Sequence, residues 1–366
     1  MRTVITHFYN EEYLLPFWIK HHREIFDHGI LINYKSTDRS VDLIKKYAPS
    51  SWEVVDSVND NFEAQFCDIE VMQYEKRVKG WKIALNVTEF FVCPNIELIE
   101  QECEKKGLNG FKTAGVVMVD NQEKKEIDIN ISLVDQKRFG FLENSFDFSA
   151  NKLAWYSGPS RSRIYHKCKT GLYFPGRHKS FLSKIPHTTN AAFTLWYGYS
   201  PWNHEFLKRK IQISKKLDPE DIKRGWGVQH ILDFSSLNEI KNYFLNQSYD
   251  LKKILEDSII KRGSYFLDIS KDEVLYDDFG LANIQIGQLK NALDETKKNL
   301  HNSEKDLKEI LESKSWKITA PLRFIYRKLI IIFHLLKALA DKDLELTKIL
   351  QKNNYMHFLK NLFKKK

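Results

Sequence analysis

The chain has 366 residues, of which 42% are hydrophobic and 13% aromatic. This length and composition exclude a disordered chain and leave room for a full domain core with an appended segment. The net charge of +9 is not spread along the chain, because residues 314–366 carry +10 and residues 1–313 carry −1. Since the basic residues are confined to the tail and no nucleic-acid motif accompanies them, we expect no nucleic-acid partner.

The number and spacing of the cysteines, together with the N-terminal sequence, predict the cellular compartment. The four cysteines form no Cys-x-x-Cys pair and are too few to staple a chain of this length. They predict a reducing environment and no structural zinc. The N-terminus reaches polar and charged residues after four apolar-leaning ones, which predicts that there is no signal peptide. We therefore expect synthesis and function in the cytoplasm.

Short apolar runs alternate with helical patterns over the first 85 residues. Strands are expected at 3–6, 30–32, 52–55 and 81–85, and helices at 12–26, 40–47 and 63–78. This alternation predicts an α/β domain with a mostly parallel sheet. Ligands bind such sheets at the carboxyl ends of the strands. Polar clusters follow the first, second and fourth strands, so the sequence predicts a ligand site at that edge.

Each polar cluster also has a structural explanation. Asp38 or Thr37 can cap the helix that follows by accepting free backbone N–H groups. Asn10 and Glu11 can start their own helix, where an acidic side chain is favoured by the helix dipole. Glu89 can be a solvated loop acid. Three such clusters at three strand ends favour a shared ligand site over these separate roles.

Two short motifs and several longer segments resemble known proteins. Asn10 and Glu11 follow the first expected strand, and a Ser-Thr-Asp turn at 36–38 follows the second. Over about the first 95 residues this pattern resembles family 2-like glycosyltransferases. Segments 161–166, 173–180 and 225–230 are similar to parts of bacterial polysaccharide and lipopolysaccharide transferases, and 315–327 is similar to a segment of many surface-glycan enzymes.

The resemblance implies a fold and an activity. The fold is a GT-A-like, Rossmann-like α/β domain with a mixed, mostly parallel sheet flanked by helices. The activity is transfer of a sugar from a nucleotide-sugar donor to a lipid-linked or growing cell-surface glycan. A second class of function is a non-catalytic relative that keeps the fold and binds glycan or partner enzymes as a scaffold.

The chain departs from the family at residues 86–90. The family subgroup has Asp-x-Asp-Glu-Phe there, and two carboxylates hold a divalent cation that neutralises the diphosphate. This chain has Asn86, Thr88 and only one acid, Glu89. Three outcomes are open: weak Mn²⁺ or Mg²⁺ binding through Glu89 and the nucleotide phosphates, metal-independent catalysis by cationic side chains, or loss of catalysis. The cationic candidates are Arg161, Arg163, Arg177 and His178.

The resemblance also implies roles for single residues. Tyr9 is a stacking surface for the nucleotide base, and a carboxylate or His takes the proton of the acceptor hydroxyl. Trp196 and its aromatic neighbours at 193–206 form either an acceptor groove or ordinary core. The residues expected to bind the nucleotide sugar are His7, Tyr9, Asn10, Glu11, Asn33, Asp38, Asn86, Thr88, Arg163 and Arg177. The catalytic candidates are Glu89, His178, His187 and His230, with Asp135 and Glu205 equally open as bases; each His also has a structural explanation.

The C-terminal part of the sequence predicts association with other copies of the chain and with a membrane. After a transferase domain at 1–265, apolar residues recur every seven positions within 266–313, which indicates either a short coiled coil that would make an oligomer or a solvated helix. In the tail at 314–366 the apolar core is eight residues long, far short of the roughly 20 that span a bilayer. Flanking Lys and Arg favour a helix lying on an anionic membrane, at the inner face of the cytoplasmic membrane, over a helical pair docked on the body.

Overall fold

The structure is a computed structural model, and it describes residues 1–122, 126–148, 153, 156, 158–188, 191–223, 227, 230–252 and 305. The chain divides into two units, Met1–Tyr276 and Asp277–Lys366, and only Lys305 of the second unit is described. Apart from Lys305, the predicted helical spacer and the basic tail lie outside the described residues, and so does the predicted boundary at residue 265. The description that follows concerns the first unit.

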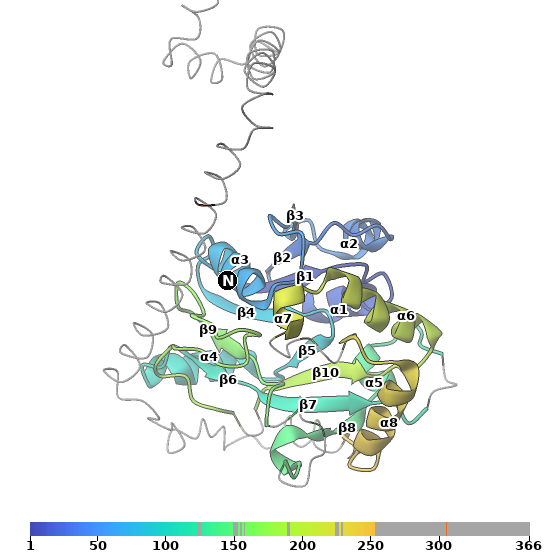
Figure 1. Cartoon of the computed structure of the whole chain (residues 1–366). Helices are drawn as coiled ribbons and strands as arrows, with labels where there is room; N and C mark the ends of the chain where they lie inside the picture. Colours follow the sequence, from blue (N-terminus) through green and yellow to red (C-terminus); the bar gives the residue numbers. More distant parts are fainter. Residues whose placement is uncertain are drawn as a thin grey trace, which may run out of the picture. The chain divides into compact units, whose positions relative to one another are not determined.

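A six-stranded sheet contains the strands predicted from the first 85 residues (Figure 1). Its order is β3-β2-β1-β4-β9-β6. The first three pairs of neighbours are parallel, whereas β9 pairs antiparallel with both β4 and β6. The strands are β1 (Arg2–Phe8), β2 (His28–Asn33), β3 (Glu53–Asp56), β4 (Trp81–Asn86), β6 (Gly110–Lys112) and β9 (Ile164–His166).

Helices cover both faces of this sheet. Val4 of β1 belongs to one apolar cluster with Trp18 of α1 (Leu15–His22), and Ile5 belongs to another with Val71 of α3 (Ala64–Glu75). Because successive strand residues point to opposite faces, α1 and α3 lie on opposite sides of the sheet. Helix α1 is shorter than predicted and has Pro16 in its first turn, where the missing N–H breaks no hydrogen bond. Helix α2 (Ser40–Tyr47) has the predicted bounds.

A second sheet has the order β11-β8-β7-β10-β5 and was not predicted from the sequence. Only β7 and β10 pair in parallel, so this sheet is mostly antiparallel. Every residue of β7 and β10 is buried, so neither strand shows the polar and apolar alternation that marks a half-exposed strand. The strands are β5 (Glu89–Val92), β7 (Ala114–Val119), β8 (Phe139–Leu142), β10 (Phe193–Tyr199) and β11 (Tyr249–Asp250).

Residues 86–89 carry the chain from the first sheet to the second. Strand β4 ends at Asn86, and β5 begins at Glu89, which is opposite Trp196 in the register of β5 and β10. Between them, the carbonyl of Thr88 accepts the backbone N–H of Tyr197 over 2.7 Å. Glu89 is therefore a buried strand residue, and its interpretation as a solvated loop acid is wrong.

The architecture confirms the prediction of a mixed α/β domain whose main sheet is mostly parallel and flanked by helices. The predicted helical extension after this domain is outside the described residues. No helix among those described is long and apolar enough to cross a membrane. The remaining helical segments are α4 (Ile96–Lys105), α5 (Leu133–Gln136), η1 (Glu143–Ser145), α6 (His204–Gln212), η2 (Ile213–Lys216), α7 (Pro219–Lys223) and α8 (Phe234–Leu245).

Candidate functional site

A cavity of about 620 Å³ lies beside the carboxyl ends of β1 and β4. The parallel register places His7 of β1 opposite Asn86 of β4, so neighbouring strands bring both side chains to one edge. This is the edge where the sequence predicts a ligand site. Of the residues predicted to bind the nucleotide sugar, those that line the cavity are His7, Tyr9, Glu11, Asn86, Thr88 and Arg177.

Asn10, Asn33 and Asp38 are outside the cavity lining and organise the backbone around it. Asp38 accepts the backbone N–H of Glu12 over 3.0 Å, and the Asn10 Oδ1 accepts that of Thr37 over 2.7 Å. Asn33 accepts a backbone N–H within its own turn. The bonds of Asn10 and Asp38 join the loop after β1 to the loop after β2, which is a structural role of the kind that the sequence left open for these two residues.

Glu89 and Arg163 form a fully buried ion pair that does not line the cavity. The Arg163 Nε donates to the Glu89 Oε2 over 2.7 Å, and Nη2 donates to Oε1. The Asn86 backbone N–H also donates to Oε2, over 2.8 Å. The carboxylate predicted to hold a cation and to act in catalysis is therefore engaged at both oxygens.

The residues at 86–89 do not fit a divalent cation. Besides the engagement of Glu89, the Asn86 Oδ1 accepts a hydrogen bond from Arg177 Nη2 over 2.7 Å, which places a positive charge beside the position where a cation would bind. Among the described residues, no three His, Cys, Asp or Glu side chains gather into a metal-binding group.

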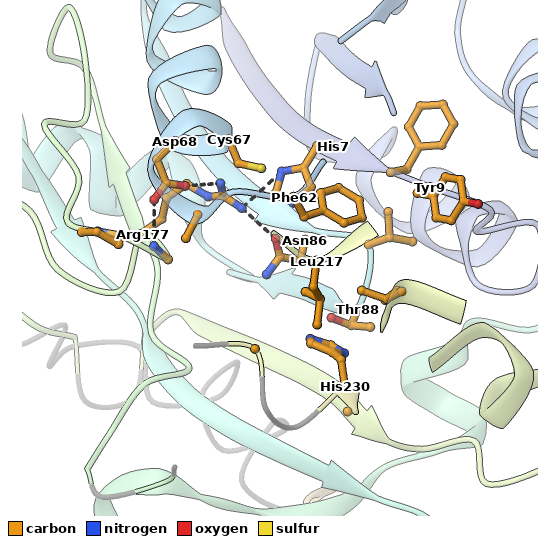
Figure 2. Close-up of a pocket in the computed structure, with 18 of the residues that line it drawn as sticks. His7, Tyr9, Phe62, Cys67, Asp68, Asn86, Thr88, Arg177, Leu217 and His230 are labelled. Atoms are coloured by element: carbon orange, nitrogen blue, oxygen red, sulfur yellow. Dashed lines mark hydrogen bonds and ion pairs between the residues drawn. The ribbon is translucent and has the colours of Figure 1, made fainter. Parts of the chain in front are cut away.

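Arg177 connects α3 to the end of β4. Figure 2 shows it reaching from Asp68 toward Asn86 and His7. Its φ of +61° lies in the left-handed region, which a residue with a side chain adopts at a cost. The backbone N–H of Gly176 donates to the Asp68 Oδ2 over 2.7 Å. Asp68 therefore holds the loop around Arg177 in place, and burial raises the pKa of its carboxyl although Arg177 opposes the shift.

The three predicted catalytic histidines differ in position. His178 and His230 line the cavity, whereas His187 does not. Burial lowers the pKa of His178 well below its usual value, and Arg163, whose Nη1 donates to its Nδ1, lowers it further. Burial and the nearby Lys210 lower the pKa of His230 to about 3. Burial and Lys112 lower that of His187 to about 4. All three are neutral near pH 7 and are weak proton acceptors there.

Glu11 has an unexpected partner on α6. Its Oε1 accepts a hydrogen bond from the Arg209 Nη1 over 2.6 Å, and the pair is buried. Its Oε2 is also buried and has no hydrogen-bond partner in the described part of the chain. Burial raises the pKa of the Glu11 carboxyl, and Arg209 opposes this shift. Glu11 thus lines the cavity with a carboxyl group whose pKa is raised by burial.

Two cations of the lining have no carboxylate partner within the described ranges. The Arg161 guanidinium carbon lies 3.7 Å from the centroid of the Trp196 ring, and the Lys210 ammonium lies 5.9 Å from the same centroid. Lys210 is 3% exposed, and burial, with Arg209 and Arg161 nearby, lowers its pKa to about 7. The sequence analysis did not identify Arg209 and Lys210 as candidate site residues, because the sequence of α6 resembles that of an ordinary surface helix.

Aromatic side chains form another part of the lining. The ring centroids of Tyr9 and Phe62 are 6.4 Å apart and their planes meet at 75°. The Lys216 ammonium lies 4.9 Å from the centroid of the Tyr9 ring. In the cluster at 193–206, Trp196 lines the cavity. The other aromatic side chains proposed there for an acceptor groove are core residues, namely Tyr197, Tyr199 and Trp202.

Comparison with known proteins adds three structural likenesses. No family model and no curated protein matches the chain. Residues 1–349 of S. aureus TarS in complex with UDP-GlcNAc are 12% identical, over 67% of this chain and 72% of that one, with a TM-score of 0.32. The same TarS fragment alone is 11% identical over 67% and 71%, with a TM-score of 0.30. HddC from Yersinia pseudotuberculosis is 13% identical over 33% and 60%, with a TM-score of 0.23. Likeness at this level assigns neither residues nor activity to this chain.

Proposed function

We propose that the chain is a glycosyltransferase that binds a nucleotide-sugar donor in the cavity at the ends of β1 and β4. The sugar goes to a hydroxyl of a glycan or a lipid-linked acceptor. The observation that supports this most is the composition of this cavity. Its lining combines an aromatic surface, two cations that form no ion pair with a carboxylate of the described residues, and the Glu11 carboxyl group, one oxygen of which has no hydrogen-bond partner among those residues.

Each part of the cavity suits one part of the donor and the reaction. The rings of Tyr9 and Phe62 suit a nucleotide base, which stacks on aromatic faces. Cationic side chains suit the phosphates. The volume of about 620 Å³ lies within the range of small-molecule sites. No step of the proposed reaction passes through a bound metal, because the residues at 86–89 do not fit one.

We assign the acceptor proton to Glu11 in this proposal. The acceptor oxygen forms a bond to the anomeric carbon while the bond from that carbon to the diphosphate oxygen breaks. The proton of the acceptor hydroxyl passes to the Glu11 carboxylate, and the electron pair of the broken bond stays with the leaving nucleoside diphosphate. Burial raises the pKa of the Glu11 carboxyl above its usual value, whereas that of His230 falls to about 3, so Glu11 is a stronger base than His230.

Calorimetric titration tests the donor site. The full chain is titrated with UDP, GDP, CMP and dTDP, once with Mn²⁺ and once with EDTA. We expect one nucleotide to bind far more tightly than the others, and to bind in EDTA. The matching nucleotide sugars are then supplied, and release of nucleoside diphosphate is followed with and without glycan acceptors. If no nucleotide binds under either condition, the transferase proposal fails.

One observation favours the non-catalytic alternative. Glu89, which the family resemblance implies as a metal ligand, instead forms a buried ion pair with Arg163. Under this alternative the fold is a scaffold in glycan assembly. Nucleotide binding without any turnover of nucleotide sugars would support it, whereas turnover that Glu11→Gln abolishes would exclude it. Membrane attachment and oligomerisation through the C-terminal region remain predictions from the sequence.

A further inference from the structure

Arg161 and Lys210 lie near the same indole ring and come from distant parts of the chain. Arg161 precedes β9, Lys210 is in α6, and the ring is that of Trp196 in β10. Their distances of 3.7 Å and 5.9 Å from its centroid keep the two charged groups within about 10 Å of each other. Two adjacent phosphates of one ligand can therefore each contact one of these cations.

The other arginines around the cavity are already neutralised. Each has a buried carboxylate as its ion-pair partner, and Asp221, the remaining acid of the lining, accepts the backbone N–H of Ala64 over 2.7 Å. The pairs are Arg163 with Glu89, Arg177 with Asp68, and Arg209 with Glu11.

Arg161 and Lys210 are short of hydrogen-bond partners as well as of counter-charges. Lys210 is 3% exposed, and its one hydrogen bond among the described residues is to the Gly198 carbonyl, over 3.3 Å. The Arg161 Nε is buried and has no partner in the same set. Lys210 is a desolvated cation that forms no ion pair among the described residues, whereas Arg161 is half-buried and donates only its backbone N–H to a carboxylate, that of Glu143, over 2.7 Å. A desolvated cation without an ion-pair partner is unfavourable, so the cavity is suited to a ligand that supplies negative charge.

We propose that Arg161 and Lys210 form a diphosphate site that does the work of a divalent cation. The guanidinium, whose carbon lies 3.7 Å from the centroid of the Trp196 ring, offers a fork of N–H donors to one phosphate, and the ammonium contacts the other. The inference deepens the proposed function and rests on it for the nucleoside attached to the diphosphate. Because Glu89 is ion-paired with Arg163, it is not free to bind a cation that would neutralise the diphosphate. In this proposal Arg161 and Lys210 neutralise the diphosphate instead.

These two cations also act during transfer. When the bond between the anomeric carbon and the diphosphate oxygen breaks, negative charge develops on that phosphate. Cations fixed beside that phosphate stabilise such charge, and the burial of Lys210 strengthens its attraction because the surrounding dielectric constant is lower than that of water. The proton goes to Glu11, so Arg161 and Lys210 need not donate one.

Inorganic pyrophosphate is the probe for this site. It is titrated into the full chain in EDTA, and the same titration is made with Arg161→Gln and Lys210→Met. Lys208→Met is the matched control, since it removes a charge from the exposed face of the same helix. Loss of one charge-assisted contact predicts affinity at least about tenfold lower for each site variant and within about twofold of wild type for the control. Thermal unfolding identifies any variant that fails to fold, and Arg161→Lys then replaces Arg161→Gln.

The outcomes separate this inference from the proposed function. Equal affinity of wild type and site variants for pyrophosphate overturns the inference, and so does binding that requires Mn²⁺. If UDP binds only with Mn²⁺, the diphosphate site is wrong and the transferase proposal survives. If pyrophosphate binding in EDTA depends on both cations but no nucleotide binds more tightly than pyrophosphate, the diphosphate site stands and the transferase proposal fails.

Discussion

Arg163 holds both carboxylate oxygens of Glu89, its Nε donating to Oε2 over 2.7 Å and its Nη2 to Oε1. The two residues are 74 positions apart, and both are essentially inaccessible to solvent. The Asn86 backbone N–H adds a further bond to the carboxylate. Glu89 is the one acid that this chain keeps where the family subgroup has Asp-x-Asp-Glu-Phe. Because both of its oxygens accept hydrogen bonds from Arg163, we interpret it as a structural residue and not as a metal ligand.

The first prediction concerns the stability of this pair. Glu89→Gln leaves Arg163 buried beside a neutral amide, and breaking a buried pair in this way costs about 3–5 kcal/mol of the free energy of unfolding. Urea unfolding followed by tryptophan fluorescence measures the loss. The double variant Glu89→Gln/Arg163→Gln is expected to recover part of it, because no unpaired charge remains. A Glu89→Gln protein as stable as wild type that has lost Mn²⁺-dependent UDP binding would mean that Glu89 is a metal ligand after all.

The second prediction concerns base stacking. Tyr9→Ala removes one of the rings of the aromatic surface, so the affinity for UDP should fall by about 5- to 150-fold, the range of one base–aromatic contact. The affinity for pyrophosphate should not change, because pyrophosphate has no base. Tyr9→Phe keeps the ring and is expected to bind UDP like wild type. Parallel calorimetric titrations check this; a similar loss for both ligands would remove Tyr9 from the base site.

The third prediction concerns the proton acceptor. Glu11→Gln keeps the shape of the side chain and a hydrogen bond to Arg209 but removes the base, so turnover should fall by about 10²- to 10⁴-fold. The change also leaves Arg209 buried beside a neutral amide, which destabilises the fold, so turnover is measured at a temperature where the variant is shown to be folded. Affinity for the nucleoside diphosphate should change far less, because Glu11 acts on the acceptor. Steady-state kinetics and calorimetry on the same preparation separate the two effects. Full turnover in Glu11→Gln would transfer the role to another group, with His178→Gln as the next variant to measure.

The fourth prediction concerns pH. Burial lowers the pKa of Lys210 to about 7 in the folded chain, with Arg209 and Arg161 contributing. His230, which also faces Lys210, stays neutral across this range because its pKa is about 3. Above pH 7 the folded state releases a proton that the unfolded state keeps up to about pH 10.4, so Lys210 makes the folded state more stable as pH rises through this window.

Ligand binding should show the opposite pH dependence. A diphosphate favours charged Lys210, so its affinity falls as pH rises above about 7 and its binding at pH 8 takes up a proton. Calorimetry in HEPES and in Tris, which differ in ionisation enthalpy, measures this uptake. Lys210→Met should abolish it and should flatten the rise of stability between pH 7 and 10. If diphosphate binding to Lys210→Met still takes up a proton, a group other than Lys210 binds that proton.

The sequence by itself determined the features that depend on near neighbours in the chain. Alternation of apolar runs and helical periods predicted β1 to β4 with α1, α2 and α3, because local periodicity sets which face of each element is buried. The polar clusters after β1 and β4 predicted where the cavity lies, since parallel strands end at one edge. His7, Tyr9 and Glu11 of the first cluster line this cavity, and their part in donor binding stays a prediction.

Only the tertiary structure decided how the charges pair. Arg163 is matched with Glu89, Arg177 with Asp68 and Arg209 with Glu11, and the partners are separated by 74, 109 and 198 positions. No local sequence pattern shows which cationic side chain lacks a carboxylate partner, because that depends on how the two sheets and α6 pack around the cavity. For this reason the sequence placed Arg163 and Glu89 at the ligand site, whereas the fold buries them as a pair and leaves Arg161 and Lys210 without carboxylate partners in the described part of the chain.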